Sequence, residues 1–158
     1  MANIHDKLFQ LLYKVAYRLS LCVWYIFKPS SYGVYISVWH DGKILVIKNS
    51  YKTEYTFPSG GIKRGESEKD AAARELLEEV NIQTRPDQLL FVGRFRGNHE
   101  FKKDTVTFFE MVCTAPPKIK VDDREVVTAE FLTPTAALGL DLSPFVRAYL
   151  REREGQPP

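Results

Sequence analysis

The segment from Gly60 to Ile82 constrains the fold more than any other part of the chain, because a glycine-containing loop leads directly into a strong helix. Ser67 and Asp70 have the three-residue spacing of a helix N-terminus, and three alanines follow at 71–73. Serine accepts a backbone N–H at the first position of a helix, and alanine has the highest helix propensity. The sequence therefore predicts a helix over about 67–80.

Three glutamates crowd one side of this predicted helix. Glu75, Glu78 and Glu79 stand at i, i+3 and i+4, a spacing at which like charges repel by a few tenths of a kcal/mol per pair. Arg74 offsets part of this repulsion through its own i+4 pair with Glu78. A solvated helix face is one explanation of such a patch. The other is a hard divalent cation, because Mg²⁺ prefers carboxylate oxygens together with substrate phosphates.

The glycines of the preceding loop favour the cation. Gly60, Gly61 and Gly65 permit positive φ angles and a close approach of the backbone to a ligand. Glycines alone also fit an ordinary strand-to-helix turn. A glycine loop that delivers directly into a helix with three clustered glutamates is harder to explain as an accident of composition.

The same segment resembles the Nudix box, which reads Gly, five residues, Glu, seven residues, then Arg-Glu-apolar-any-Glu-Glu-any-Gly-apolar. The matching residues are Gly60, Glu66, Arg74, Glu75, Leu76, Glu78, Glu79 and Ile82. The one departure is Asn81, where the family usually has glycine, and asparagine is the next-best residue for a left-handed helix end. The stretch 55–58 also resembles the family's aromatic-to-proline lead-in, so the likeness covers roughly residues 33–132.

The resemblance implies a role for each matching residue and a Mg²⁺ or Mn²⁺ cofactor. Glu78 and Glu79 match the principal metal ligands, and the carbonyl of Ser59 matches a backbone ligand. Glu75 matches the residue that orients or deprotonates the attacking water, or in some members binds metal itself. Arg74 would hold Glu75 by a charge-assisted hydrogen bond.

Other candidate residues rest on weaker signals. Many family members add a glutamate from a later loop, six residues before an aromatic residue; Glu125 precedes Phe131 by that interval, although Asp122, Asp123 and Glu110 compete with it. The candidate substrate contacts are Gly60, Gly61, Tyr55, Arg94, Arg96 and Lys102. A solvated basic hairpin explains the last three equally well, and ordinary packing is the alternative for Tyr55.

The N-terminal residues 8–27 predict an amphipathic helix. Leu8, Leu11, Leu12, Val15, Leu19, Cys22 and Ile26 share a face opposite Gln10, Lys14 and Arg18. The uninterrupted apolar run at 19–27 is far short of the ~20 residues that a membrane span needs. We expect this helix to pack on its own domain or on a partner subunit, as in a homodimer; contact with a membrane surface is the alternative.

The rest of the chain indicates a single mixed α/β domain. A hairpin is predicted at 34–39 and 43–48 around Asp41-Gly42, with further strands at 89–95, 105–114 and 126–132 and a last helix from Ser143-Pro144 to about 153. The resemblance implies a Nudix-like α/β/α sandwich with a mixed central sheet. We divide the chain into the helix at 1–28, the hydrolase domain at 29–154 and a frayed tail at 155–158.

The charge balance and the cysteine count exclude some classes of protein. A formal net charge of +2 from 22 basic and 20 acidic side chains argues against general nucleic-acid binding. Cys22 and Cys113 have no metal-ligand spacing, and we expect buried free thiols in a cytoplasmic protein, with the inner face of a membrane as the alternative location.

The sequence therefore predicts a metal-dependent hydrolase of a small nucleotide-like substrate, which cleaves the pyrophosphate bond of a nucleoside diphosphate linked to another moiety. An enzyme acting on dinucleoside polyphosphates or capped RNA 5′ ends is one alternative, and a non-catalytic nucleotide-sensing module is another. Isomerase chemistry on an isoprenoid diphosphate would require a reactive cysteine near the metal, and Cys113 is a poor candidate.

Overall fold

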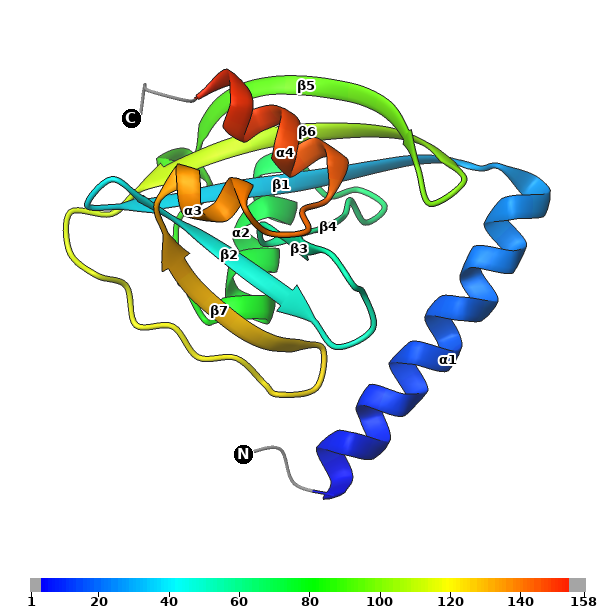
Figure 1. Ribbon diagram of the computed structural model, residues 1–158. Coiled ribbons are helices and arrows are strands. Elements are labelled where there is room, and N and C mark those ends of the chain that lie inside the picture. Colours follow the sequence, from blue (N-terminus) through cyan, green and yellow to red (C-terminus); the bar gives the residue numbers. More distant parts are fainter. Residues whose placement is uncertain (1–3, 154–158) are drawn as a thin grey trace.

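A mixed seven-stranded sheet forms the centre of the structure, a computed structural model that describes residues 4–153 (Figure 1). Its strands are β1 (Ser30–His40), β2 (Lys43–Asn49), β3 (Tyr55–Thr56), β4 (Ser59–Gly61), β5 (Leu90–His99), β6 (Lys102–Val112) and β7 (Val126–Leu132). The main path runs β3-β2-β1-β6-β5; β4 pairs with β1 and β7 pairs with β2. β1 pairs with β6 in parallel, and the other ladders between these strands of the described chain are antiparallel.

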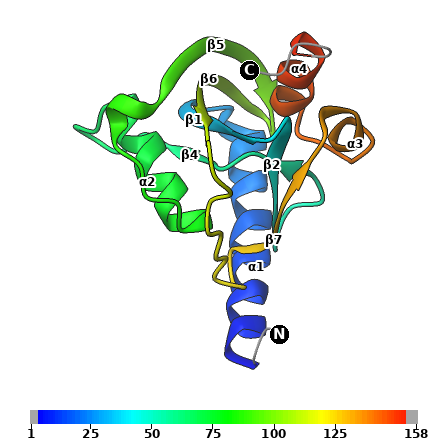
Figure 2. The same ribbon diagram turned by 90° about the vertical axis from the view of Figure 1, so that its left-hand side faces the viewer.

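Helices cover both faces of the sheet (Figures 1 and 2). α2 (Glu68–Val80) lies on one face, and α3 (Pro134–Leu138) and α4 (Pro144–Glu152) lie on the other. The alternation of β1 explains this: Val34, Ile36 and Val38 join the core under α2, whereas Trp39 joins the core under α4. The predicted α/β/α sandwich with a mixed sheet is therefore confirmed.

Local turn chemistry places the elements that the sequence predicts. Asp41 and Gly42 have φ angles of 50° and 68°, as a two-residue hairpin turn requires, and they join β1 to β2. The hydroxyl of Ser67 accepts the backbone N–H of Asp70 at the start of α2. Asn81 ends α2 in the left-handed conformation at φ 58°, and the N–H of Ile82 donates to the carbonyl of Leu76.

Several elements were not predicted. β3 and β4 have only two and three residues and lie where we expected a loop, and α3 and a short 3₁₀ turn at Pro86–Gln88 were missed. Such short strands are defined by their partners: β4 exists because Ser59–Gly61 pair with 33–35 of β1. The expected frayed tail at 155–158 lies outside the described residues.

The N-terminal helix α1 (Ile4–Phe27) stands beside the domain, and the orientation of its apolar face is the main correction to the sequence analysis (Figure 1). α1 does contact its own domain, but through the opposite face. The exposed apolar residues rule out packing of that face on the domain and leave a partner subunit or a membrane surface as the expected contact. Cys22 is exposed and Cys113 is half-buried, so neither thiol is buried as expected. Within the described part of the chain, no helix is long and apolar enough to cross a membrane.

Candidate active site

A cleft of about 620 Å³ lies where α2, β1 and β4 meet the loop before β7 and the hairpin between β5 and β6. Nine of the residues singled out from the sequence line it: Ser59, Gly60, Gly61, Arg74, Glu75, Glu78, Glu79, Lys102 and Glu125. These residues come from separate parts of the chain, so the fold brings together what the sequence separates by up to 66 positions.

Gly60 is required by the close approach of Glu75. A Cβ atom at position 60 would lie 2.1 Å from Oε1 of Glu75 and 2.5 Å from Oε2, so the carboxylate occupies the space that any other side chain would fill. Glycine permits a positive φ angle at all three loop positions, but only Gly65 adopts one, at 80°. The absence of a side chain, and not backbone freedom, explains the glycine at position 60.

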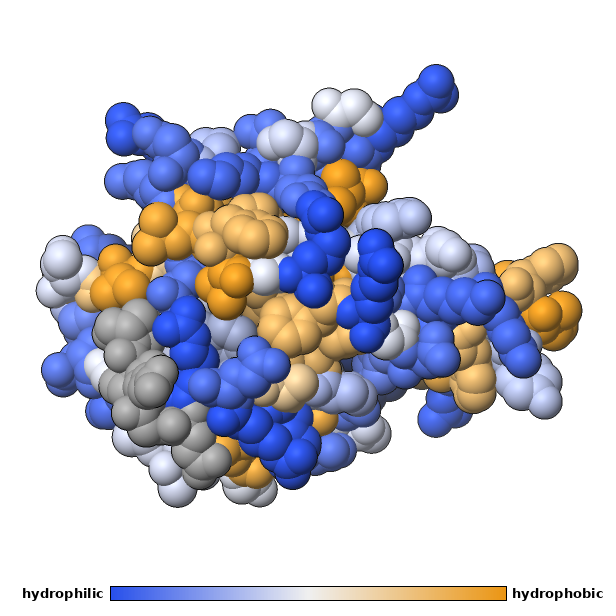
Figure 3. Space-filling model, turned by 90° about the horizontal axis from the view of Figure 1, so that it is seen from above, coloured by the Kyte–Doolittle hydropathy of each residue, from blue (hydrophilic) through white to orange (hydrophobic). Residues whose placement is uncertain are grey.

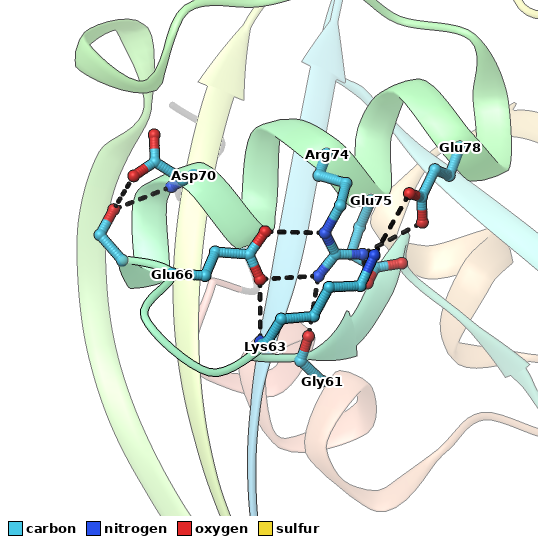
Figure 4. A network of polar contacts seen from close by, with 8 residues as sticks. Gly61, Lys63, Glu66, Asp70, Arg74, Glu75 and Glu78 are labelled. Carbon is cyan, nitrogen blue, oxygen red and sulfur yellow. Dashed lines mark hydrogen bonds and ion pairs between the residues drawn. The ribbon is translucent and has the colours of Figure 1, made fainter.

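Arg74 is the centre of the polar network in Figure 4. Its guanidinium donates to both oxygens of Glu66, at 2.8 and 2.9 Å, and to the carbonyl of Gly61 at 2.9 Å. It also contacts Glu75 and lies 3.1 Å from Glu78. The hydrogen bond from Arg74 lowers the pKa of Glu66 to about 2, helped by the backbone N–H of Lys63. Glu66 therefore braces the loop and Arg74, while Arg74 in turn fixes Glu75.

Glu75 and Glu79 are held in an environment that disfavours their charge. Glu79 is 8% exposed and accepts the backbone N–H of Ser59 at 2.8 Å. Burial raises the pKa of Glu79 well above its ordinary value, against the lowering effect of that hydrogen bond, and Glu75 and Glu125 raise it further. Burial also raises the pKa of Glu75, although Arg74 opposes the shift. Without a bound cation, both groups therefore favour protonation more than a free glutamate does.

Glu125 lies on the cleft wall, where the hydroxyl of Tyr51 donates to its Oε1 at 3.0 Å. Asp122, Asp123 and Glu110 do not line the cleft, and two of these three acids are engaged elsewhere. Asp122 accepts three consecutive backbone N–H groups and so shapes the loop that carries Glu125. Glu110 is buried between Tyr149 and Arg153 beneath α4. Among these acids the geometry favours Glu125 as the one available to the cleft.

Three predicted substrate contacts do not line the cleft. Tyr55 packs among the apolar residues beneath α4, with the Lys48 ammonium 4.6 Å from its ring centre. Arg94 is tied to Glu68 at 2.8 Å, and Arg96 is exposed two residues along β5. Because strand residues alternate faces, Arg94 and Arg96 share one side of β5, and neither reaches the cleft.

The sequence reasoning missed other residues of the wall. Lys52 and Lys63 line the cleft, as do Asn49 at the end of β2 and Glu100 at the tip of the β5–β6 hairpin. Glu100 binds Lys52 at 2.9 Å and Lys102 at 3.4 Å. Burial alone would raise the pKa of Glu100, but Lys52 and the hydroxyl of Tyr17 hold it below its usual range. No sequence signal marked Lys52, because the loop at 50–54 carries one lysine and one glutamate.

The oxygen donors around the cleft are of the kind that bind a hard divalent cation, but their side chains must rotate before they can bind one ion together. Carboxylate oxygens of Glu75, Glu78, Glu79 and Glu125 face one cleft, and these are the ligands that Mg²⁺ and Mn²⁺ prefer. Within residues 4–153, no three acidic or other ligating side chains already converge as a metal site. The Glu78 side chain is 52% exposed, so its carboxylate has room to turn inward from its ion pairs with Lys63 at 3.6 Å and Arg74 at 3.1 Å.

Comparisons with known proteins agree with the fold described above and with the resemblance to the Nudix family. A family model of the NUDIX domain matches residues 29–152. The RNA pyrophosphohydrolase of Actinobacillus succinogenes is 36% identical over 62 residues, which make up 39% of this chain and 32% of that protein. The chain thus spans about a third of the length of the curated relatives it matches.

Two solved structures share the fold at low sequence identity. An Ap4A hydrolase from C. elegans has a TM-score of 0.67 at 19% identity, with 79% of this chain and 96% of that chain covered. The NUDIX domain of Shewanella oneidensis NrtR, complexed with ADP ribose, has a TM-score of 0.70 at 13% identity, with 83% and 90% covered. α1 precedes the segment that the family model matches.

Proposed function

The chain belongs to the Nudix family, and from that premise we propose that it is a metal-dependent hydrolase that cleaves the pyrophosphate bond of a nucleoside diphosphate linked to another moiety. The observation that carries this proposal is the seating of Glu75 against Gly60 in a cleft that Glu78, Glu79 and Glu125 also line. The Glu75 carboxylate fills the space that a side chain at position 60 would need, so its position is fixed. A residue that orients a water molecule needs such a fixed position.

The proposed roles follow from burial and contacts. Glu78, Glu79, Glu125 and the Ser59 carbonyl would hold Mg²⁺ or Mn²⁺. The bound ion would neutralise phosphate charge and acidify a water molecule. Glu75 would orient that water and accept its proton, because its raised pKa makes it a better base than an exposed glutamate. Arg74 would act as a positioning residue for Glu75, and Glu66 would brace Arg74.

Lysines on the cleft wall support a polyphosphate substrate. The ammonium of Lys63 is paired to Glu78, so that a turn of Glu78 toward a metal ion would release Lys63 for a phosphate oxygen. Lys52 and Lys102 also line the cleft, where both pair with Glu100. We propose that the non-phosphate half of the substrate lies beside these two lysines and the ring of Tyr51.

Substrates with longer phosphate chains form the second candidate class. The names of the similar proteins favour it, since one is an RNA pyrophosphohydrolase and another an Ap4A hydrolase. A non-catalytic sensing module is disfavoured because every carboxylate of the box is present. The isomerase alternative finds no support in the geometry: Cys113 lines a different hollow, at 111–118, and not the cleft.

A substrate panel tests the proposal. The purified chain is incubated with Mg²⁺ or Mn²⁺ and ADP-ribose, nucleoside triphosphates, dinucleoside polyphosphates, nucleotide sugars or triphosphate-ended RNA, and the products are separated by ion exchange. We expect metal-dependent release of a nucleoside monophosphate from at least one diphosphate-linked substrate. Turnover confined to RNA or dinucleoside polyphosphates would select the second class, and turnover of none of them would reject the hydrolase.

A further inference from the structure

The helix α1 has two faces of opposite character, and its polar and aromatic face is the one that contacts the domain. Gln10 donates to the carbonyl of Asp123 at 2.7 Å, and the hydroxyl of Tyr17 donates to Glu100 at 2.7 Å. The rings of Tyr13 and Tyr17 lie against Tyr51, and the ammonium of Lys102 lies 4.0 Å from the centre of the Trp24 ring. These contacts recur along the helix at spacings that mark one side of it.

The opposite side carries an exposed apolar stripe, which we define as Leu8, Leu11, Leu12, Val15, Leu19, Val23 and Ile26. Each of these side chains is between 49% and 70% exposed. Soluble surfaces rarely leave a continuous apolar row of this length open to water, because the row loses the free energy that burial would provide. In Figure 3 apolar side chains gather on the protruding right-hand lobe, which is the C-terminal end of α1.

Basic residues border the stripe and acidic residues do not. Lys7, Lys14 and Arg18 are spaced by seven and four residues, so they lie along one flank, and Lys28 follows the end of the helix. All four are exposed. Asp6 is the one acidic residue between positions 4 and 28, and it is turned to the domain, where it pairs with Arg124 at 3.0 Å. The outward side of α1 therefore presents only positive charge.

We propose that α1 lies in the interface of an anionic lipid surface, with the apolar stripe among the acyl chains and the basic flank at the headgroups. This arrangement matches the two features of the outward side, and it is how amphipathic helices bind membranes without crossing them. A second copy of the chain fits less well. An antiparallel pair of such helices would bring their basic flanks together, and in either orientation the outward side has no acidic group to pair with a basic flank.

The orientation of α1 has a consequence for the cleft. Its inner face contacts Tyr51, Lys52, Glu100 and Lys102, all of which line the cleft. A lipid-bound helix would thus hold the cleft close to the surface while leaving the carboxylates of α2 unchanged. The proposal concerns binding alone and stands or falls separately from the proposed function.

Vesicle cosedimentation of the full chain tests the proposal. We expect binding to vesicles of phosphatidylglycerol and phosphatidylcholine, and much weaker binding to phosphatidylcholine alone. The double variant Val15→Glu, Leu19→Glu should weaken binding by at least about 100-fold, since it places two charges in the middle of the stripe. The matched control is Leu90→Glu, Phe91→Glu, which adds the same charge at two comparably exposed positions of β5 and should bind as the wild type does.

A separate variant tests how much the basic flank contributes to vesicle binding. Changing Lys7, Lys14 and Arg18 to glutamine should reduce the preference for anionic vesicles by about fivefold per residue, and so by on the order of 100-fold in all. Circular dichroism spectra and cooperative thermal melts establish that each variant is folded.

Three results would overturn the proposal. The wild type could fail to bind anionic vesicles at low salt. The double variant Val15→Glu, Leu19→Glu could bind them as tightly as the wild type. Sedimentation equilibrium could also show a stable dimer that this double variant dissociates while no vesicle binds, which would assign the stripe to a second copy.

Discussion

Gly60→Ala is the substitution that probes the site geometry most sharply. Its methyl group would lie 2.1 Å from Oε1 of Glu75 and 2.2 Å from Cδ, whereas nonbonded heavy atoms settle at about 3.5 Å. The carboxylate must therefore retreat by more than about 1 Å. A displacement of that size in a catalytic group costs about 100-fold in rate, so we predict a fall in kcat of that order.

The fold should tolerate the same change. The obstructing atoms belong to the end of a flexible side chain, and Gly60 has no positive φ that alanine would strain. We therefore expect the melting temperature to fall by no more than about 4 °C, as for a loss near 1 kcal/mol. Turnover of the best substrate from the panel, together with differential scanning fluorimetry, measures both quantities on one preparation.

Two further glycines provide controls. Gly61→Ala adds the same methyl one residue later, where nothing lies within 4 Å, and should cost less than about tenfold. Gly93→Ala, on β5 outside the cleft, meets only the Phe95 ring at 3.7 Å and should leave turnover unchanged. Combining Gly60→Ala with Glu75→Gln should be strongly non-additive, because both act on one carboxylate. Full activity of Gly60→Ala, or an equal loss in Gly61→Ala, would refute the assignment of Glu75.

Three other predictions concern stability. Mn²⁺ should raise the melting temperature by roughly 2–8 °C. Glu79→Gln should abolish most of that gain, while the metal-free variant should be as stable as the metal-free wild type or more stable. A much lower melting temperature of the metal-free variant would mean that Glu79 holds the fold together. Because burial raises the pKa of both Glu79 and Glu75, the folded state keeps protons that the unfolded state has released, so stability of the metal-free protein should decline as pH rises above the ordinary glutamate value. Glu79→Gln should flatten that decline in a series of melts from about pH 4 to 8, and an unchanged slope would contradict the cause given. Removing residues 1–28 should leave a folded domain with metal-dependent turnover, since β1 begins at Ser30 and the surface that α1 leaves is largely polar; loss of the cooperative melt would show that α1 is structurally required.

The parts of the fold that follow from local chemistry were predictable. The hairpin at Asp41-Gly42, the start of α2 at Ser67 and its left-handed end at Asn81 each depend on a few neighbouring residues. The parallel pairing of β1 with β6 was not, because it joins residues about 70 positions apart and has no signature in either strand alone. β3 and β4 were not predicted for a related reason, since a strand of two or three residues is too short to show an alternating pattern.

The candidate site divides in the same way. Gly60, Glu75, Glu78 and Glu79 are close in sequence, and one loop and one helix bring them into the cleft. Lys52 and Glu100 reach the cleft from the loop after β2 and from the tip of the β5–β6 hairpin, and nothing in their own sequence neighbourhood indicated it. Arg94 and Arg96 were misplaced because charge was weighed without the alternation of β5.

The orientation of α1 shows where an amphipathic pattern stops being informative. The apolar period correctly predicts a helix, but it says only that one face avoids water. The hydrogen bonds of Gln10 and Tyr17 and the aromatic contacts of Tyr13 and Trp24 fix the other face to the domain. A helix that buries its apolar face in the domain would have the same apolar periodicity.

The most direct test of the central claim is the turnover of Glu78→Gln and Glu79→Gln beside wild type, on one diphosphate-linked substrate at saturating Mg²⁺ or Mn²⁺. Glu130→Gln is the matched control, since Glu130 is exposed on β7 and lies outside the cleft. We predict that both site variants lose at least ~100-fold in kcat with their circular dichroism spectra unchanged, while Glu130→Gln and wild type turn over alike and stop when EDTA is added. Near-normal turnover in both site variants, or wild-type turnover that survives EDTA, would contradict it.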